Sequence, residues 1–206
     1  KMCKTYKNFL FAFFFMFIGP NSVASIELID FESYLNSIHS LKSKFNQINA
    51  DGSISNGVIW LKKPGKLRFE YQNPNSLLLV ANSGFLAIID KISNTPPQRY
   101  LLNSTPLSFL TEESITLVNS EIQYFVHKDI DIATLTIPKI NNKINGSLVI
   151  NFKINPIEFD GWVLETPSGD VITMKLLDPE FNLPFKDEST FGIGAEIQKH
   201  MLTISN

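Results

Sequence analysis

The sequence predicts a mostly β protein, built as an antiparallel sheet that curves or closes into a barrel, with one or two helices covering one side. Three observations predict this class. Short segments with a hydrophobic period of two recur along the chain, separated by turn residues. The connections between them are too short for parallel crossovers, which need about a dozen residues or more. Several middle strands are apolar on both faces, and too few helices are predicted to cover both.

The first 25 residues have the layout of a secretory signal. Three lysines in residues 1–7 precede an apolar run over residues 9–18, and a Gly-Pro pair and small residues follow. This order of basic, apolar and small-residue regions is typical of a signal peptide. The apolar run has ten residues, whereas a membrane-spanning helix needs about 20. We therefore expect export, with cleavage after Ala24 or Ser25.

Removing residues 1–25 changes the composition. The chain has 18 Lys and Arg against 20 Asp and Glu, and three of the lysines lie in this segment, so the mature chain carries 15 against 20, a net charge of −5. Six of the 17 Phe and the single cysteine, Cys3, lie there too. The remaining chain lacks the basic character of a nucleic-acid-binding protein. Its core must form without disulfides.

The hydrophobic period changes after the first predicted element, from that of a helix to that of strands. A helix is expected over residues 29–41, where apolar side chains recur about every 3.6 residues and Asp30 is placed to cap the start. The period then becomes two, with turn sequences such as Asp51-Gly52 between the segments. Strands are expected at residues 44–49, 54–62, 66–71, 76–81, 85–90 and 98–102.

A short helix is expected to interrupt the strands, because Thr105 can cap it and Pro106 suits its first position. Strands resume at residues 122–127, 133–138, 147–154, 161–165 and 171–177. We find no internal repeat or linker, so residues 26–191 are expected to form one domain. Residues 181–191 are expected to be irregular, and residues 192–206 are expected to form a loosely ordered tail.

Residues that carry chemistry are scarce. His39, His127 and His200 lie in separate segments and form no metal-ligand motif, so no metal site is predicted. The sequence contains no nucleophile elbow and no glycine-rich phosphate loop. We therefore expect a protein that is not an enzyme and uses no cofactor.

Residues 45–110 carry motifs that occur together in a known family. In order, they are Phe45-Asn-Gln47, the hairpin sequence of residues 57–65, the segments 67–71 and 78–80, and Thr105-Pro-Leu107. This order resembles the periplasmic outer-membrane lipoprotein carrier family LolA. That family has a Phe-x-Gln strand, a Gly-x-Leu-Trp-x-x-Arg-Pro-Gly hairpin, an aromatic-rich partner strand and an Asn-Thr-Pro-like helix start. The resemblance in element order extends over roughly residues 28–180.

The resemblance implies an unclosed antiparallel β-barrel, or half-barrel, covered by the N-terminal helix and a short lid helix. It implies a monomeric periplasmic carrier that shelters lipoprotein acyl chains in a hydrophobic cavity. Its partners would be acylated lipoproteins, an inner-membrane lipoprotein-releasing ABC transporter and, if present, an outer-membrane receptor, with no nucleic acid. The alternative is a non-catalytic regulator on the same fold that senses lipids or lipoproteins in the periplasm.

Lys63 departs from the family pattern. The position before the hairpin proline is usually Arg, which in the family holds the lid shut. An ammonium group offers less than the rigid five-donor fork of a guanidinium group. We therefore expect a weaker closed state, or a latch supplied by another residue. The competing interpretation is that Lys63 is a solvated turn residue.

Strand parity predicts which side chains line the cavity. If Lys63 points inward, Leu61 and Ile59 share its face. On the next strand the charged residues alternate with Leu67, Phe69 and Tyr71, which are therefore expected to point inward. Further candidates for the cavity lining are Leu79, Ile89, Leu107 and Leu110. The competing interpretation is that these are ordinary core residues.

Overall fold

The structure is a computed structural model of the chain, and it describes residues 26–72, 74–117, 121–137, 146–166 and 168–205. The predicted signal segment lies outside these residues. The strands are β1 (Ser40–Ile48), β2 (Ile54–Lys62), β3 (Lys66–Tyr71), β4 (Leu77–Asn82), β5 (Phe85–Asp90), β6 (Gln98–Leu101), β7 (Gln123–His127), β8 (Ile132–Ile137), β9 (Ser147–Ile154), β10 (Ile157–Glu165) and β11 (Val171–Phe181). The helices are α1 (Leu28–Ser37), α2 (Leu107–Leu110), α3 (Asp187–Phe191) and α4 (Ile193–Ile204), with 3-10 turns η1 (Leu102–Ser104) and η2 (Lys128–Ile130).

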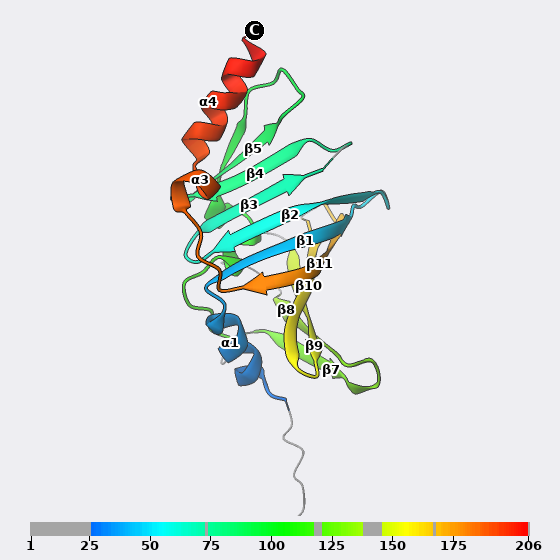
Figure 1. Ribbon diagram of the computed structural model, residues 1–206. Coiled ribbons are helices and arrows are strands. Elements are labelled where there is room, and N and C mark those ends of the chain that lie inside the picture. Colours follow the sequence, from blue (N-terminus) through cyan, green and yellow to red (C-terminus); the bar gives the residue numbers. More distant parts are fainter. Residues whose placement is uncertain (1–25, 73, 118–120, 138–145, 167, 206) are drawn as a thin grey trace, which may run out of the picture.

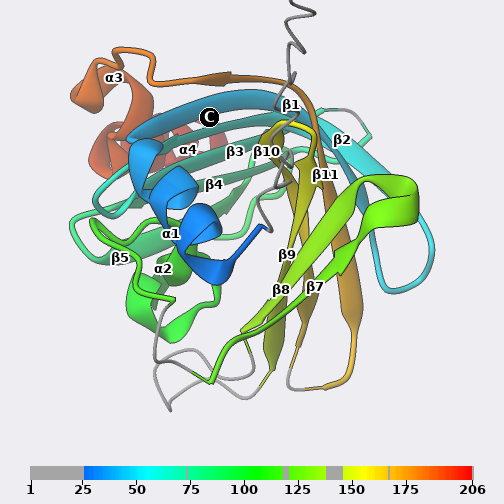
Figure 2. The same ribbon diagram turned by 90° about the horizontal axis from the view of Figure 1, so that it is seen from below.

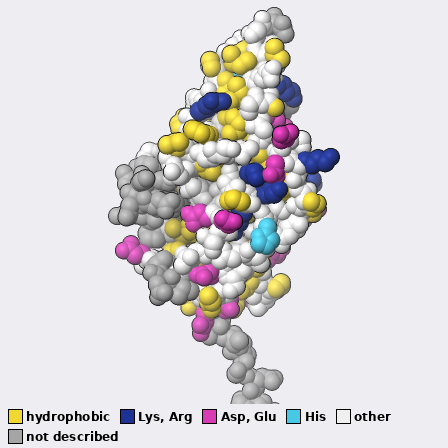
Figure 3. All heavy atoms as spheres, turned by 90° about the vertical axis from the view of Figure 1, so that its left-hand side faces the viewer, with side chains coloured by type: hydrophobic (Ala, Val, Ile, Leu, Met, Phe, Trp, Pro, Cys, Tyr) yellow, Lys and Arg dark blue, Asp and Glu magenta, His cyan; other side chains and the backbone are white. Residues whose placement is uncertain are grey.

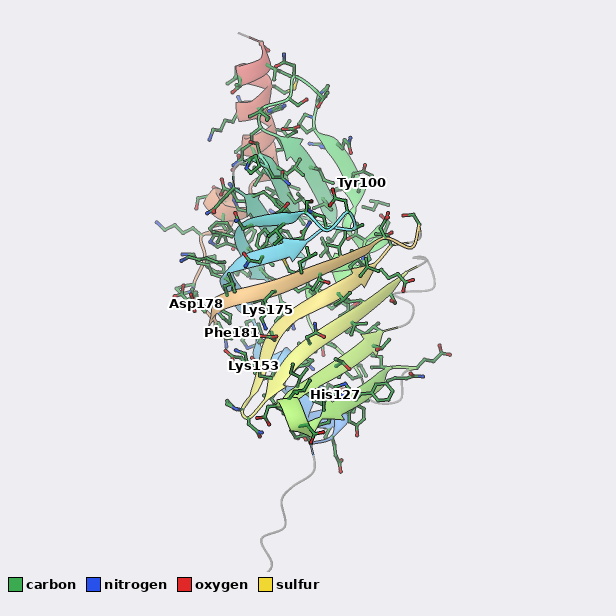
Figure 4. All side chains as sticks on the ribbon, turned by 90° about the vertical axis from the view of Figure 1, so that its right-hand side faces the viewer. Tyr100, His127, Lys153, Lys175, Asp178 and Phe181 are labelled. Atoms are coloured by element: carbon green, nitrogen blue, oxygen red, sulfur yellow. The ribbon has the colours of Figure 1, made fainter. Side chains whose placement is uncertain are left out.

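The strands form one 11-stranded antiparallel sheet in the order β6-β5-β4-β3-β2-β1-β11-β10-β9-β8-β7. Neighbours in the sheet are neighbours in sequence except at the centre, where β1 pairs with β11. The edge strands β6 and β7 do not pair with each other, so the sheet stays open. Figure 4 shows Tyr100 of β6 and His127 of β7 far apart, with the other strands between them. The predicted mostly β, unclosed antiparallel architecture is confirmed.

The predicted boundary of the first helix is wrong at its C-terminal end. Asp30 does act at the start, where its carboxylate accepts a hydrogen bond from the backbone N–H of Glu27 (2.8 Å). The helix ends at Ser37, because Ile38 is extended, and Leu41 already belongs to β1 opposite Leu61. Leu41 fits the helical period, but it reaches the core from a strand. Periodicity alone cannot separate the two cases.

The sheet curves around α1 and α2, as Figure 2 shows. The main hydrophobic core lies on this concave face. Helix α1 buries Phe31 and Leu35 there, and the Phe31 ring lies 4.9 Å from the ring of Phe152 on β9, measured between centroids. The two helices therefore cover the inside of the half-barrel.

Helices α3 and α4 cover part of the convex face (Figure 1). A second apolar cluster forms there from Leu78, Val80 and Ile89 of β4 and β5, against Ile193 and Ile197 of α4. The expectation of a loosely ordered tail over residues 192–206 is therefore corrected. Strands β4 and β5 are apolar on both faces because helices cover them from both sides.

Ion pairs add to this contact between α3–α4 and the sheet. Asp187 of α3 accepts hydrogen bonds from Lys62 (2.6 Å) and Lys66 (2.9 Å). Arg68 of β3 donates to Glu196 of α4 (2.8 Å). These ion pairs are partly buried, and the side chains of Arg68 and Glu196 are only 12% and 20% exposed. They hold α3 and α4 against β2 and β3 beside the apolar cluster.

Candidate functional site

The concave face brings the strongest sequence candidates together. Ile59, Leu61, Leu67 and Phe69 belong to one buried cluster, and each is at most 3% exposed. Ile59 lies directly opposite Phe69, and Leu61 directly opposite Leu67, across the β2–β3 pair. The structure therefore places these four side chains on the concave face, as strand parity predicts.

The weaker candidates divide between the two faces. Leu110 is buried in the same concave cluster, and Tyr71, Leu79 and Leu107 pack against it. Ile89 does not belong there: it lies opposite Leu78 and under α4, on the convex face. Its assignment to the cavity is corrected. Because β5 is apolar on both faces, its sequence carries no signal of direction, and Ile88 is the residue that reaches the concave cluster.

Aromatic side chains outside the predicted set form much of the interior. The Phe45 ring lies edge-on to Phe69 (centroids 5.7 Å apart) and to Tyr71 (5.2 Å). Trp162 of β10 lies edge-on to Phe69 (6.2 Å) and stacks on Phe159 (6.0 Å). Phe45 could have been found, because it stands in the Phe-x-Gln motif. Phe159 and Trp162 lie in a segment without a specific motif.

The pairing of β1 with β2 requires a glycine at position 57. Gly57 lies opposite Phe45. A Cβ atom at Gly57 would come within 2.8 Å of the Phe45 ring and 2.2 Å of the backbone oxygen of Glu70. The glycine therefore leaves the space that the Phe45 ring fills.

The interior is closed. The cavity that remains between α1, α2 and β2 has a volume of about 20 Å³. A single water molecule needs about this much space. Pockets for small-molecule ligands typically have about 300–1,000 Å³. Among the described residues, this interior therefore has room for a larger apolar group only if a covering helix moves away.

The β2–β3 turn holds both covering helices. The half-buried Lys63 side chain donates a hydrogen bond from Nζ to the backbone oxygen of Leu35, near the end of α1 (2.8 Å). The backbone N–H of Gly65 donates to the oxygen of Thr111, at the end of α2 (2.9 Å). Burial lowers the pKa of Lys63 to about 8, although the Glu112 carboxylate acts in the opposite direction. The Lys63 side chain thus contacts α1, and the contact with the lid helix comes from the backbone.

The segment after α2 runs along α1 and is bonded to it. The Asn36 amide exchanges two hydrogen bonds with the backbone of Ile115, both 2.8 Å. One turn earlier on α1, the Glu32 carboxylate accepts a hydrogen bond from the N–H of Leu117 (2.7 Å). Residues four apart lie on the same face of a helix. One face of α1 therefore holds this segment, which we call the strap (residues 111–117).

Three polar side chains form a row of hydrogen bonds near the β1–β2 loop. The Tyr71 hydroxyl donates a hydrogen bond to the Gln47 side-chain oxygen (2.6 Å), and the Gln47 nitrogen donates to Asn49 (2.6 Å). Burial raises the pKa of Tyr71 to about 12, against the opposing effect of its bond to Gln47. The aromatic cluster is thus bounded here by hydrogen-bonded polar groups.

Groups for catalysis or metal binding do not come together at this site. Within the described residues, no three His, Cys, Asp or Glu side chains are close enough to hold a metal ion. None of the helices among these residues is long and apolar enough to cross a membrane. The arrangement offers an apolar interior behind helices that are attached by a few polar contacts.

The fold and site define a class of protein: an open antiparallel half-barrel with an apolar concave face closed by helices. The family model described as outer membrane lipoprotein carrier protein LolA matches residues 36–191. The chain belongs to this family, as the motifs of residues 45–110 predict. The family consists of periplasmic, non-enzymatic proteins that bind lipoproteins.

Three solved structures are similar to this chain at low sequence identity. An uncharacterized conserved protein from Thermus thermophilus has 8% identity and a TM-score of 0.47, covering 79% of this chain and 89% of its own. A LolA superfamily protein from Nitrosomonas europaea has 9% identity and a TM-score of 0.42, covering 81% and 98%. A DUF1329 family protein from Desulfovibrio piger has 10% identity and a TM-score of 0.45, covering 81% and 95%. No curated protein matches the sequence.

Proposed function

We propose that this protein is a periplasmic carrier that shelters the acyl chains of lipoproteins inside the half-barrel. It would receive them from an inner-membrane ABC transporter and release them at the outer membrane. The observation that carries this proposal is the continuous apolar concave face of β2 and β3. The helices that close it are not part of the sheet.

A carrier is needed because an acyl chain is costly to expose to water. At about 0.8 kcal/mol per methylene group, a sixteen-carbon chain costs on the order of 12 kcal/mol to expose. A lipoprotein with such chains cannot cross an aqueous compartment unaided at a useful rate. An apolar interior that replaces the membrane during the crossing removes this cost.

The hydrogen bonds that close the interior are weak enough for a lipid chain to displace. Lys63 bonds α1, Gly65 bonds the end of α2, and Asn36 bonds the strap. A typical hydrogen bond contributes about 0.5–1.5 kcal/mol net. Breaking these few bonds costs less than the burial of one long acyl chain returns, provided that the acyl chain replaces the apolar contacts that Phe31 and Leu35 of α1 make with the concave face. The ligand itself can therefore drive the opening, and the helices can close again after release.

The proposal is tested by recovering the protein from the periplasm while release to the outer membrane is blocked. We expect a soluble complex with acylated lipoprotein in stoichiometric amount, measured by size-exclusion chromatography and mass spectrometry. Recovery of the protein without cargo under these conditions would contradict the carrier function. A regulator that only senses lipids would bind cargo in far smaller amounts than one per chain.

A matched pair of variants shows whether cargo lies in the interior. Phe69→Glu places a carboxylate on the buried concave face, whereas Phe125→Glu places it on an exposed position of β7. We expect the first variant to lose cargo and the second to keep it. Circular dichroism checks that both fold. If Phe69→Glu does not fold, the uncharged Leu79→Gln, at a half-buried position of the same face, takes its place. Normal cargo binding by the folded interior variant would contradict the proposed site.

A further inference from the structure

A second hollow lies outside the half-barrel, on the convex face. It is formed by the β4–β5 turn, the outer side of β5 and β6, and the start of α4. Its volume is about 380 Å³, against about 20 Å³ for the interior cavity. This volume falls in the range of about 300–1,000 Å³ that is usual for ligand pockets. We call this hollow the outer groove.

The apolar part of the outer groove comes from three side chains. Ala87 of β5 is buried, Ile193 comes from the start of α4, and Phe85 is 51% exposed. Figure 3 shows hydrophobic side chains gathered on the part of this surface around α4, while charged side chains gather beside and below it. A half-exposed phenyl ring next to an open hollow offers apolar area that a ligand could cover.

The outer groove contains one charged side chain, Arg99 of β6, which shares its face with Ala87 opposite. The chain has two arginines. Arg68 is bound by Glu196 (2.8 Å) and Glu70 (3.4 Å). The Arg99 guanidinium, in contrast, makes no ion pair or hydrogen bond with the residues that the structure describes, and no carboxylate lines the groove. The positive end of the α4 dipole lies at the same wall and adds to its charge.

We propose that the outer groove binds a medium-chain fatty acid. The Arg99 guanidinium would hold the carboxylate through two parallel hydrogen bonds, and the alkyl chain would lie across Phe85, Ala87 and Ile193. A methylene group is about the size of a water molecule, which occupies about 30 Å³ in the liquid, so the groove accommodates on the order of ten carbons. This site differs from the interior cavity, where the cation among the described lining residues, Lys63, is engaged by the backbone oxygen of Leu35.

Titration with decanoate, below its micelle concentration, tests the proposal. In ¹⁵N NMR spectra of the mature chain we expect the amide signals of Gly192 and Gly194 to shift. Arg99→Gln should weaken binding by about tenfold or more, because charge-assisted hydrogen bonds are lost. Phe85→Ser should weaken it as well, through the lost apolar contact. Decanol and decyltrimethylammonium, with the same tail but no negative charge, should bind more weakly than decanoate.

Matched variants separate a specific site from general adsorption. Lys44→Gln removes another exposed cation and Phe125→Ser another exposed phenyl ring, and both should leave decanoate binding unchanged. Equal binding by wild type and Arg99→Gln would overturn the proposal. Signal shifts confined to interior amides such as those of Leu61 and Leu67 would overturn it too. Phe69→Glu, or Leu79→Gln in its place, should lose lipoprotein cargo but keep decanoate in the outer groove, so the two proposals fail separately.

Discussion

Asn36 and Ile115 exchange two hydrogen bonds of 2.8 Å, so a helix side chain pairs with the strap backbone as a neighbouring strand would. No strand of the sheet pairs with the strap among the described residues. The lid is therefore closed by side chains of α1 and by the β2–β3 turn, and each of the side-chain contacts can be removed by one substitution.

Asn36→Ala should loosen the attachment of the strap to α1. The substitution leaves the N–H and the oxygen of the buried Ile115 without their partner, which costs about 1–3 kcal/mol of unfolding free energy. We expect lower stability in urea and faster uptake of a fluorescent acyl dye. Asn46→Ala, at an exposed position of β1, is the matched control and should change neither. Unchanged dye uptake in Asn36→Ala would show that the strap does not limit opening.

Lys63→Arg should strengthen the closed state. A guanidinium group can donate to several acceptors at once, whereas the ammonium group bonds the oxygen of Leu35. We expect lower equilibrium occupancy of the interior by the acyl dye than in wild type at pH 7. Equal occupancy in the two proteins would mean that Lys63 does not act as a latch.

The lowered pKa of Lys63 predicts that the free energy of unfolding depends on pH. Burial lowers the pKa of Lys63 to about 8 from its ordinary value of 10.5, so between these values the unfolded chain binds the proton and the folded chain does not. Stability contributed by this group must therefore rise with pH through this window. Urea unfolding at pH 7 and pH 10 should show wild type gaining stability relative to Lys63→Arg, whose side chain stays charged. A constant difference between the two proteins would contradict the prediction.

Tyr71→Phe should destabilise the end of the interior near the β1–β2 loop. It removes the donor to the part-buried Gln47 oxygen, which costs about 1 kcal/mol. Tyr100→Phe removes a similar hydroxyl bond, to Gln98 at 2.7 Å, at an exposed position and should cost close to nothing. Urea unfolding of both variants measures the difference. Equal effects would show that burial does not strengthen the Tyr71 bond.

Ile197→Asp should detach α4 from the convex face. It places a charge against Leu78, Val80 and Ile89, and we expect a loss of about 2 kcal/mol or more from the apolar contact. Hydrogen exchange should become faster in α4 and on β4. Leu202→Asp, on the exposed side of the same helix, is the control. Equal protection of α4 in wild type and Ile197→Asp would show that the ion pairs of Arg68 and Asp187 hold α3–α4 in place.

Much of the half-barrel was predictable because local signals agree with it. The alternation of charged and apolar residues in β3 shows which side of the strand faces inward, and Leu67 and Phe69 follow from it. The short connection between residues 44–49 and 54–62 likewise predicts an antiparallel pair, in which Phe45 lies opposite Gly57. Ile89 was misplaced because a strand that is apolar on both faces has no such alternation.

The sequence by itself determined the antiparallel meander, since a period of two with short polar turns allows few other arrangements. It also determined the inward face of β2 and β3. Only the tertiary structure decided that α1 binds the strap on the inside, and that α3 and α4 cover the outside. These contacts join residues such as Asn36 and Ile115, or Val80 and Ile197, that lie far apart in the chain. Local periodicity cannot encode them, because they depend on how the curved sheet brings its surfaces to distant segments.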